Sequence, residues 1–306
     1  MRNVPIARLP PPVLPGDKVG VAALSGPADP VRLEAGLAAL RDLGFEPVVA
    51  ANAFDRSGLF AGNDGHRLES FHQLLRNPEI KAVFFVRGGY GLMRLLPRID
   101  WDLLGSEPRA FIGYSDLTPL LWQIVERFGW VTFHGPMVAA DLARGLTKME
   151  RISLLDALAG RGPFLVPLAS AGGEPAEEMT EGPLVGGCLS MLTALLGTPY
   201  FPSLRGRILF WEDIDEPLYR LDRMLTHLRL SGSLSDLRAM VIGHLTCSDG
   251  SASERWRCRL EEAVKGFPWP VFWGLECGHQ APNRTLPMGL QARLEMAAGR
   301  MELFEA

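Results

Sequence analysis

The sequence predicts an α/β protein with two domains, a parallel-sheet domain followed by a smaller domain of mixed α and β structure. Its 306 residues, 47% of them hydrophobic, are enough to form two buried cores. In the first half, continuous apolar runs alternate with segments of helical periodicity, as in a parallel sheet covered by helices on both faces. In the second half, short strand-like runs are separated by turns and helices.

The first domain holds four strand-like runs, each followed by a turn or a helix. Leu33, Leu37 and Leu40 recur at helical spacing after the first run, and Gly44 provides a stop signal. The expected elements are, in order, strand Val19–Leu24, a helix from Val31, strand Pro47–Ala50, helix Arg67–Leu75, strand Ala82–Val86, a helix beginning at Leu92–Leu96, and strand Phe111–Tyr114. Ligands of such sheets bind at the carboxyl ends of the strands, so we expect a site at that edge.

A polar stretch of small residues with a proline separates the two domains. We therefore divide the chain into an N-terminal domain at residues 1–167, a linker at residues 168–182 and a C-terminal domain at residues 183–306. In the C-terminal domain the expected elements are strands Gly206–Trp211 and Ala239–Gly243 and helices Leu218–Leu228 and Glu254–Val264.

Composition and charge exclude several classes of function. The net charge of −4 gives no bulk attraction to nucleic acid or to an anionic membrane, so the expected partner is a small molecule. Residues 1–10 are broken by prolines and lack the apolar core of a signal peptide, and no continuous apolar run reaches about 18 residues. We expect a cytoplasmic protein.

The four cysteines do not indicate a metal site or disulfides. They are widely scattered and form no C-x-x-C pair, so we interpret them as reduced packing residues, and we expect no metal and no cofactor. They are Cys188, Cys247, Cys258 and Cys277.

The segment Phe111–Asp116 has the features of a nucleophile on a strand-to-helix turn. Ser115 follows Gly113 and Tyr114 at the end of an apolar run, and the backbone N–H of Asp116 would be free to hold an oxyanion. Leu117 stands where a G-x-S-x-G elbow has its second glycine, and a serine at a helix start is often only an N-cap. The motif alone therefore leaves the role of Ser115 open.

A serine nucleophile needs a base and an acid that orients the base. His279 lies in an aperiodic loop after a strand-like run, His134 ends another strand-like run, and His244 has the position of a half-buried strand histidine. Among the acids, Glu212 follows three large apolar residues, so we expect it to be semi-buried and paired. The order would then be serine, glutamate, histidine.

Six motifs together resemble the L,D-carboxypeptidases, also called muramoyltetrapeptide carboxypeptidases, whose relatives include the microcin-immunity serine peptidases. The resemblance extends from about Gly16 to the C-terminus. The motifs are Val86–Gly91, Gly113–Asp116, Thr132–Pro136, Gly197–Tyr200, Glu212–Ile214 with Tyr219–Arg223, and Gly278–His279 with Pro282–Asn283 and Leu286–Gly289. For the fold, we expect a flavodoxin-like N-terminal domain and a swivelling-type C-terminal domain.

The resemblance implies a Ser-Glu-His triad of Ser115, Glu212 and His279, and it makes His134 a structural or pocket-lining residue. It also implies oxyanion donors at the backbone N–H groups of Gly89 and Asp116. The implied enzyme is a serine peptidase that releases D-alanine from murein tetrapeptides during peptidoglycan recycling. Together with the charge of the site, the resemblance suggests Arg87 and the neighbouring Gly88 as substrate-binding residues, with Arg87 close to the terminal carboxylate. The alternative role for Arg87 is a surface salt bridge. We expect a homodimer that acts on a muropeptide.

One position departs from the family pattern. Many relatives have Gly-Gly-Asn-Leu where this chain has a thiol at Cys188, and a thiol cannot make the hydrogen bonds of an amide. Two alternative functions therefore stay open. One is an immunity-type peptidase or amidase acting on a peptidyl-nucleotide antibiotic, which an aromatic platform of tryptophans would favour, and the other is a non-catalytic protein that binds a small ligand. The candidates for the platform are Trp122, Trp211, Trp256, Trp269 and Trp273.

Overall fold

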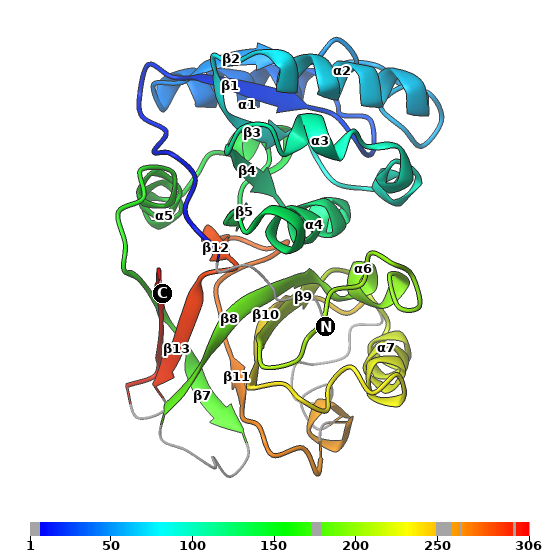
Figure 1. Cartoon of the computed structure of the whole chain (residues 1–306), viewed down its shortest axis with the longest axis vertical. Coiled ribbons are helices and arrows are strands. Elements are labelled where there is room, and N and C mark those ends of the chain that lie inside the picture. The colour runs from blue at the N-terminus through cyan, green and yellow to red at the C-terminus, as the bar shows by residue number, and fades with distance from the viewer. Residues whose placement is uncertain (1–6, 173–178, 249–258, 264, 296–297, 306) are drawn as a thin grey trace.

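The computed structural model describes residues 7–172, 179–248, 259–263, 265–295 and 298–305. Its strands form a six-stranded and an eight-stranded sheet, which lie in opposite halves of the molecule along its long axis (Figure 1). All strands of the first sheet except β12 come from the first half of the chain. This architecture confirms the predicted α/β fold class.

The first sheet has five parallel strands in the order 2-1-3-4-5, which is the order of flavodoxin-like folds. They are β1 (Lys18–Ala22), β2 (Glu46–Val49), β3 (Ile80–Phe85), β4 (Ala110–Gly113) and β5 (Thr132–His134). The sixth strand, β12 (Leu286–Met288), comes from near the end of the chain and pairs antiparallel with β5 (Figure 1). The C-terminal part of the chain thus contributes an edge strand to the N-terminal domain.

Helices cover both faces of this sheet, because neighbouring residues of each buried strand point to opposite sides. Phe84 and Ile112 belong to one core cluster, and Phe85 and Phe111 belong to the other. Side chains of α1 and α5 pack in the first cluster, and side chains of α2 and α4 pack in the second. The helices are α1 (Pro30–Asp42), α2 (Asp64–Arg76), α3 (Trp101–Leu104), α4 (Thr118–Phe128) and α5 (Lys148–Leu158).

Local signals explain where most of these helices begin and end. Asp29 caps α1 by accepting hydrogen bonds from the N–H groups of Val31 and Arg32, and Gly129 ends α4 in a left-handed conformation with a φ of 64°. The prediction of a helix from Leu92 was wrong. The chain forms two 3-10 turns there, Leu92–Arg94 and Leu96–Arg98, because a proline at position 97 has no N–H to donate to a helical hydrogen bond.

The second sheet is mixed, as expected for the C-terminal domain. Strands β8 to β11 run parallel, and β13, β14, β6 and β7 join them antiparallel. The strands are β6 (Phe164–Pro167), β7 (Ala169–Gly172), β8 (Met179–Cys188), β9 (Ile208–Asp213), β10 (Ala239–Leu245), β11 (Val271–Trp273), β13 (Gln291–Glu295) and β14 (Arg300–Phe304). Two helices, α6 (Leu189–Ala194) and α7 (Leu218–Leu230), pack against this sheet through buried leucines.

The stretch expected to link the domains contains strand residues. Strand β7 and the first residues of β8 lie within residues 168–182, and both strands pair inside the second sheet. The local sequence does not indicate these strands, because their residues are small and polar and their pairing partners lie in distant segments of the chain. Residues 173–178 of the expected linker lie outside the described residues, as does most of the helix expected over 254–264, of which residues 259–263 are helical.

The C-terminal ends of β3, β4 and β5 face the second domain. Gly88, Ser115 and His134 stand at or just after these ends, and the ring of His134 contacts Phe210 of β9, with ring centroids 5.0 Å apart. The predicted site edge is therefore also the domain interface. Within the described ranges, no helix has the length and apolar character needed to span a bilayer.

Candidate active site

Ser115 occupies a sharp turn between β4 and α4. Its φ is 61°, in the left-handed region, whereas Tyr114 before it is fully extended and residues Ser115–Leu117 form a 3-10 turn that leads into the helix. A non-glycine residue in such a conformation typically costs about 1–3 kcal/mol and is retained where the site needs it. This is the strand-turn-helix geometry that presents a nucleophile, and Ser115 is half-buried.

The Gly88–Gly89 turn after β3 packs against Ser115. A Cβ atom on Gly88 would lie 2.7 Å from Ser115 Cβ, 2.8 Å from Ser115 Oγ and 3.4 Å from the backbone nitrogen of Asp116. Gly89 has a φ of 109°, and the carbonyl of Gly88 accepts a hydrogen bond from the N–H of Gly26 at 3.1 Å. The structure thus brings Gly88, with Gly89 next to it, against Ser115 and the backbone nitrogen of Asp116.

The side chain of Asp116 turns inward and connects three loops. It is buried and accepts hydrogen bonds from Ser25 Oγ at 2.6 Å and from the N–H of Leu92 at 2.9 Å. Burial raises the pKa of Asp116, although these hydrogen bonds and the charge of Arg67 oppose the rise. The carboxyl group therefore braces the loops after β1, β3 and β4, a role that sequence reasoning missed.

Glu212 and His279 form a pair in which the glutamate is buried and the histidine is partly exposed. Glu212, in β9, is completely buried, and its Oε2 accepts from the N–H of His279 at 3.2 Å and lies 2.6 Å from His279 Nδ1. Gly278 allows this approach, because its φ is 126° and a Cβ there would lie 2.7 Å from the same oxygen. A proton on Nδ1 held by Glu212 leaves Nε2 as the nitrogen able to accept a proton.

The electrostatics of His279 follow from this pairing. Burial by itself lowers the pKa of His279, but the charge and hydrogen bond of Glu212, with the charges of Asp213 and Asp141, raise it above its ordinary value. The imidazole lies edge-on to the ring of Tyr114, the residue before Ser115, with ring centroids 4.9 Å apart. Residues distant in the sequence thus meet at the turn that holds Ser115.

His134 lies behind this group and is enclosed. It is buried at the end of β5, its ring centroid is 5.4 Å from that of Tyr114, and its Nε2 has no hydrogen-bond partner among the described residues. Burial lowers the pKa of His134 to about 4, which the nearby charge of Glu212 opposes. A neutral, enclosed imidazole fits the pocket-lining role.

The remaining predicted residues lie at the rim of the group or away from it. His244 is half-buried, and its Nε2 lies 2.9 Å from the carbonyl oxygen of Pro282. Arg87 is exposed, contacts the carbonyl oxygen of Pro27 at 3.3 Å and forms no ion pair with any residue that the structure describes. Its guanidinium is available to an anionic ligand.

Cys188 and Asp213 form a second pair of buried side chains beside Glu212. The Sγ atom of Cys188 lies 3.2 Å from Ser190 Oγ and 3.7 Å from Asp213 Oδ1, and Asp213 accepts the N–H of Ser190 at 2.7 Å. Burial, with the charge of Glu212, raises the pKa of Asp213 to about 6. The burial of Asp213 was not predicted, although its position directly after Glu212 at a strand end was a signal for it.

The described residues contain no cluster of three or more histidine, cysteine, aspartate or glutamate side chains that could hold a metal ion. The arrangement combines a strained serine, a paired glutamate and histidine, and a glycine turn that packs against the serine. Chemically, such a site can carry out acyl transfer through a serine.

Comparison with known proteins identifies the family. The LD-carboxypeptidase N-terminal domain of peptidase family S66 matches residues 19–135, and the LD-carboxypeptidase C-terminal domain matches residues 181–294. The chain belongs to this family. The predicted family resemblance is therefore confirmed, and the protein is a member of a peptidase family.

Individual members of the LD-carboxypeptidase family resemble the chain over almost its whole length. A probable murein peptide carboxypeptidase of Bacillus subtilis is 36% identical over 290 residues, which are 92% of this chain and 90% of that protein. The crystal structure of a muramoyltetrapeptide carboxypeptidase from Oxalobacter formigenes superposes with a TM-score of 0.82 at 31% identity, covering 94% of this chain and 97% of that one. The structure of MccF with glutamyl sulfamoyl guanosine has a TM-score of 0.88 at 25% identity and covers 99% of each chain.

Proposed function

We propose that this family member is a serine L,D-carboxypeptidase that releases the terminal D-alanine of murein tetrapeptides. The observation that carries the proposal is the pair of buried Glu212 and partly exposed His279 beside the turn that holds Ser115, with Glu212 Oε2 2.6 Å from His279 Nδ1. The names of the Bacillus and Oxalobacter relatives support the same substrate class. Peptidoglycan recycling, a cytoplasmic location and a homodimer belong to this proposal as expectations.

In the proposed reaction, His279 Nε2 takes the proton of Ser115 Oγ as that oxygen attacks the peptide carbonyl. The backbone N–H groups of Gly89 and Asp116 hold the tetrahedral oxyanion. His279 then gives its proton to the departing amine of D-alanine, and water hydrolyses the acyl-enzyme. Glu212 keeps the proton on Nδ1 and stabilises the imidazolium while it exists.

The proposed substrate ends in a free carboxylate, for which Arg87 provides the positive charge. The scissile bond joins the L-centre of a diamino acid, such as meso-diaminopimelate or L-lysine, to D-alanine. Arg87 is exposed directly before the Gly88–Gly89 turn and has no carboxylate partner among the described residues, so its charge is not already neutralised.

The similarity to MccF favours a second candidate, an immunity-type peptidase or amidase acting on a peptidyl-nucleotide antibiotic. The tryptophans do not strengthen it. Four of the five candidates for an aromatic platform are buried in the structure, and the fifth, Trp256, lies outside the described residues. The buried ones are Trp122, Trp211, Trp269 and Trp273.

A competition assay with three peptides tests the substrate. We expect the tetrapeptide that ends in free D-alanine to be cleaved, and its C-terminal amide and the D-alanyl-D-alanine pentapeptide to be poor substrates, because neither places a carboxylate beside Arg87. Mass spectrometry of the mixture reads the three rates together. Equal cleavage of the amide would favour the immunity-type candidate.

Trapping with a serine-directed phosphonate tests the chemistry without a peptide. We expect one adduct, located on Ser115 by peptide mapping, and none in the Ser115→Ala variant. If the protein formed no adduct but still bound muropeptides, the result would favour the non-catalytic binding protein.

A further inference from the structure

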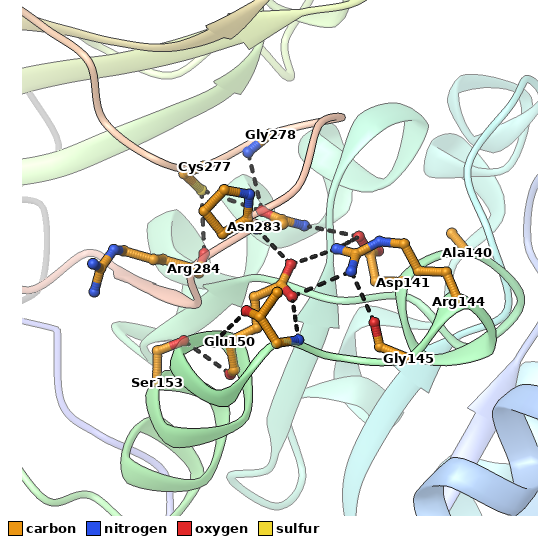
Figure 2. Close-up of polar contacts among 12 residues, drawn as sticks. Ala140, Asp141, Arg144, Gly145, Glu150, Ser153, Cys277, Gly278, Asn283 and Arg284 are labelled. Carbon is orange, nitrogen blue, oxygen red and sulfur yellow. Dashed lines mark hydrogen bonds and ion pairs between the residues drawn. The ribbon is translucent and has the colours of Figure 1, made fainter.

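A buried network of charged and polar groups connects Glu150, in the N-terminal domain, to Asn283 and Gly278 near the end of the chain (Figure 2). Glu150, in α5, is completely buried, and Arg144 forms ion pairs with it and with Asp141. Asp141 Oδ2 also accepts the N–H of Met137 at 3.0 Å. The residues in these ion pairs and this hydrogen bond all belong to the N-terminal domain.

Asn283, in the loop that carries His279, completes the network from the other side. Its backbone N–H donates to Glu150 Oε1 at 2.6 Å, and its side-chain Oδ1 accepts from the N–H of Gly278 at 3.0 Å. Asn283 is itself completely buried, and Figure 2 shows it between Glu150 and Gly278. One residue thus connects the carboxylate of the N-terminal domain to the peptide that precedes His279.

The same loop is held again two residues further along. The N–H of Thr285 donates to Ser153 Oγ of α5 at 3.2 Å, and the next residue begins β12, which pairs with β5. The C-terminal part of the loop between Gly278 and β12 is therefore fixed to the N-terminal domain by two directional hydrogen bonds, and Asn283 passes this constraint on to Gly278.

Glu150 uses its full set of acceptor sites in this arrangement. Besides Asn283 and Arg144, it accepts from the N–H of Thr147 at 2.7 Å. Burial raises the pKa of Glu150, but Arg144 and the backbone N–H groups of Asn283 and Thr147 lower it to about 2 overall. The carboxylate is therefore charged at neutral pH.

A buried carboxylate is a costly group to place at a contact between domains, because apolar packing of the same volume often stabilises as much or more. A charged network differs from apolar packing in fixing direction and distance. Here the group that it fixes is the backbone adjacent to His279.

We propose that Glu150 is a positioning residue for His279. It lies in the domain that carries Ser115, and through Asn283 it sets where the imidazole of the other domain stands relative to the serine. The proposal rests on the proposed function, in which His279 is the base. Because a displacement of about 1 Å can cost about 10²-fold in rate, loss of this contact should be visible in kinetics.

The test compares Glu150→Gln with Glu126→Gln. Glu126, near the far end of α4 from Ser115, forms an ion pair with Arg207, directly before β9, so it also joins the two domains but does not contact the His279 loop. The readout is the rate at which a fluorophosphonate labels Ser115. We expect about 10²-fold slower labelling in Glu150→Gln and a change of less than about 2-fold in Glu126→Gln. With the tetrapeptide, the loss should appear in kcat and leave KM unchanged.

A second comparison separates positioning from general damage to the fold. If Glu150 acts through His279, then Glu150→Gln should cause no further loss in a His279→Ala background, whereas a merely structural defect would add to it. Asn283→Ala serves if Glu150→Gln does not fold, because it keeps the ion pairs of Arg144 and removes the acceptor for Gly278, together with the longer contacts to Cys277 and Asp141. We expect it to slow labelling of Ser115 at least about 10-fold.

Three results would overturn the proposal: equal labelling of Glu150→Gln and Glu126→Gln, additive losses in the His279→Ala background, or unchanged labelling of Asn283→Ala. Wild-type enzyme that is not labelled at Ser115 at all would instead contradict the proposed function. The two failures are therefore distinguishable.

Discussion

Gly88 packs directly against Ser115, so that a Cβ atom on Gly88 would lie 2.7 Å from Ser115 Cβ and 2.8 Å from Oγ. Both of these atoms belong to Ser115, whose backbone is strained, so the turn leaves no space for the added atom. Gly88→Ala should therefore displace the serine and slow its labelling by a fluorophosphonate about 10²-fold.

The control for this prediction is Gly65→Ala, in the first turn of α2, where the added atom would meet only Asn63 Oδ1, at 3.3 Å. Its labelling rate should equal that of wild type. Normal labelling of Gly88→Ala would mean that the turn moves without cost to the site.

The left-handed backbone conformation of Ser115 should reduce the stability of the protein. Both Ser115→Ala and Ser115→Gly remove the hydroxyl and should abolish hydrolysis. Glycine, however, adopts a φ of 61° without a Cβ clash, so the free energy of unfolding of Ser115→Gly should exceed that of Ser115→Ala by about 1 kcal/mol. Urea unfolding followed by circular dichroism measures the difference. A less stable glycine variant would argue that the turn is unstrained.

The two histidines at the site should differ sharply in their effect on catalysis. His279→Ala should lower kcat more than about 10³-fold, because it removes the proposed base. His134→Ala should lower kcat much less, since that imidazole is neutral and enclosed, and should mainly reduce thermal stability by leaving a cavity. Steady-state kinetics and melting curves of both variants check this, and the reverse ranking would exchange their roles.

The pH dependence should reflect the raised pKa of His279. The base must be neutral to accept a proton, so kcat/KM should fall with decreasing pH through a pKa above the ordinary 6.5. The stability that this raised pKa contributes is fully present below pH 6.5 and is lost as the pH rises through the folded-state value.

Glu212→Gln gives the matching test. It removes the charge that raises the pKa of His279, so the acidic limb of the kcat/KM profile should move to lower pH while the maximal rate falls. An acidic limb at the same pH in both enzymes would mean that the titration of His279 does not determine it.

Chelation should not affect activity. The proposed reaction takes its nucleophile, base and oxyanion donors from the chain, so incubation with EDTA should leave the rate of tetrapeptide cleavage unchanged. Loss of activity that added zinc restores would contradict the serine mechanism.

The fold of the first domain was largely predictable because its signals are local. Continuous apolar runs such as Ala82–Val86 are buried on both faces, and helix caps are read from a few adjacent residues. The helix expected from Leu92 failed where a proline two residues past Leu95 divided it into 3-10 turns. Strand β7 was missed because its partner, β11, lies far away in the chain.

The residues of the candidate site also differ in whether a local sequence pattern predicts their role. Ser115 and Glu212 were each indicated by an apolar run that ends at a polar residue. The role of Glu150 was not, since the Thr147-x-x-Glu150 pattern predicts only a capping box, which the structure does contain. That this carboxylate also binds the backbone of Asn283 depends on how the two domains pack, and no local pattern encodes that.

The pairing of β12 with β5 has a consequence for the synthesis of this protein. Strand β5 lacks its neighbour until the ribosome has made almost the whole chain, because β12 lies at residues 286–288. The nascent first sheet therefore carries an open edge, the kind of surface that recruits strands from other chains. A terminated product lacking the last residues would keep that edge, and the cell would meet it as a substrate for chaperones and proteases.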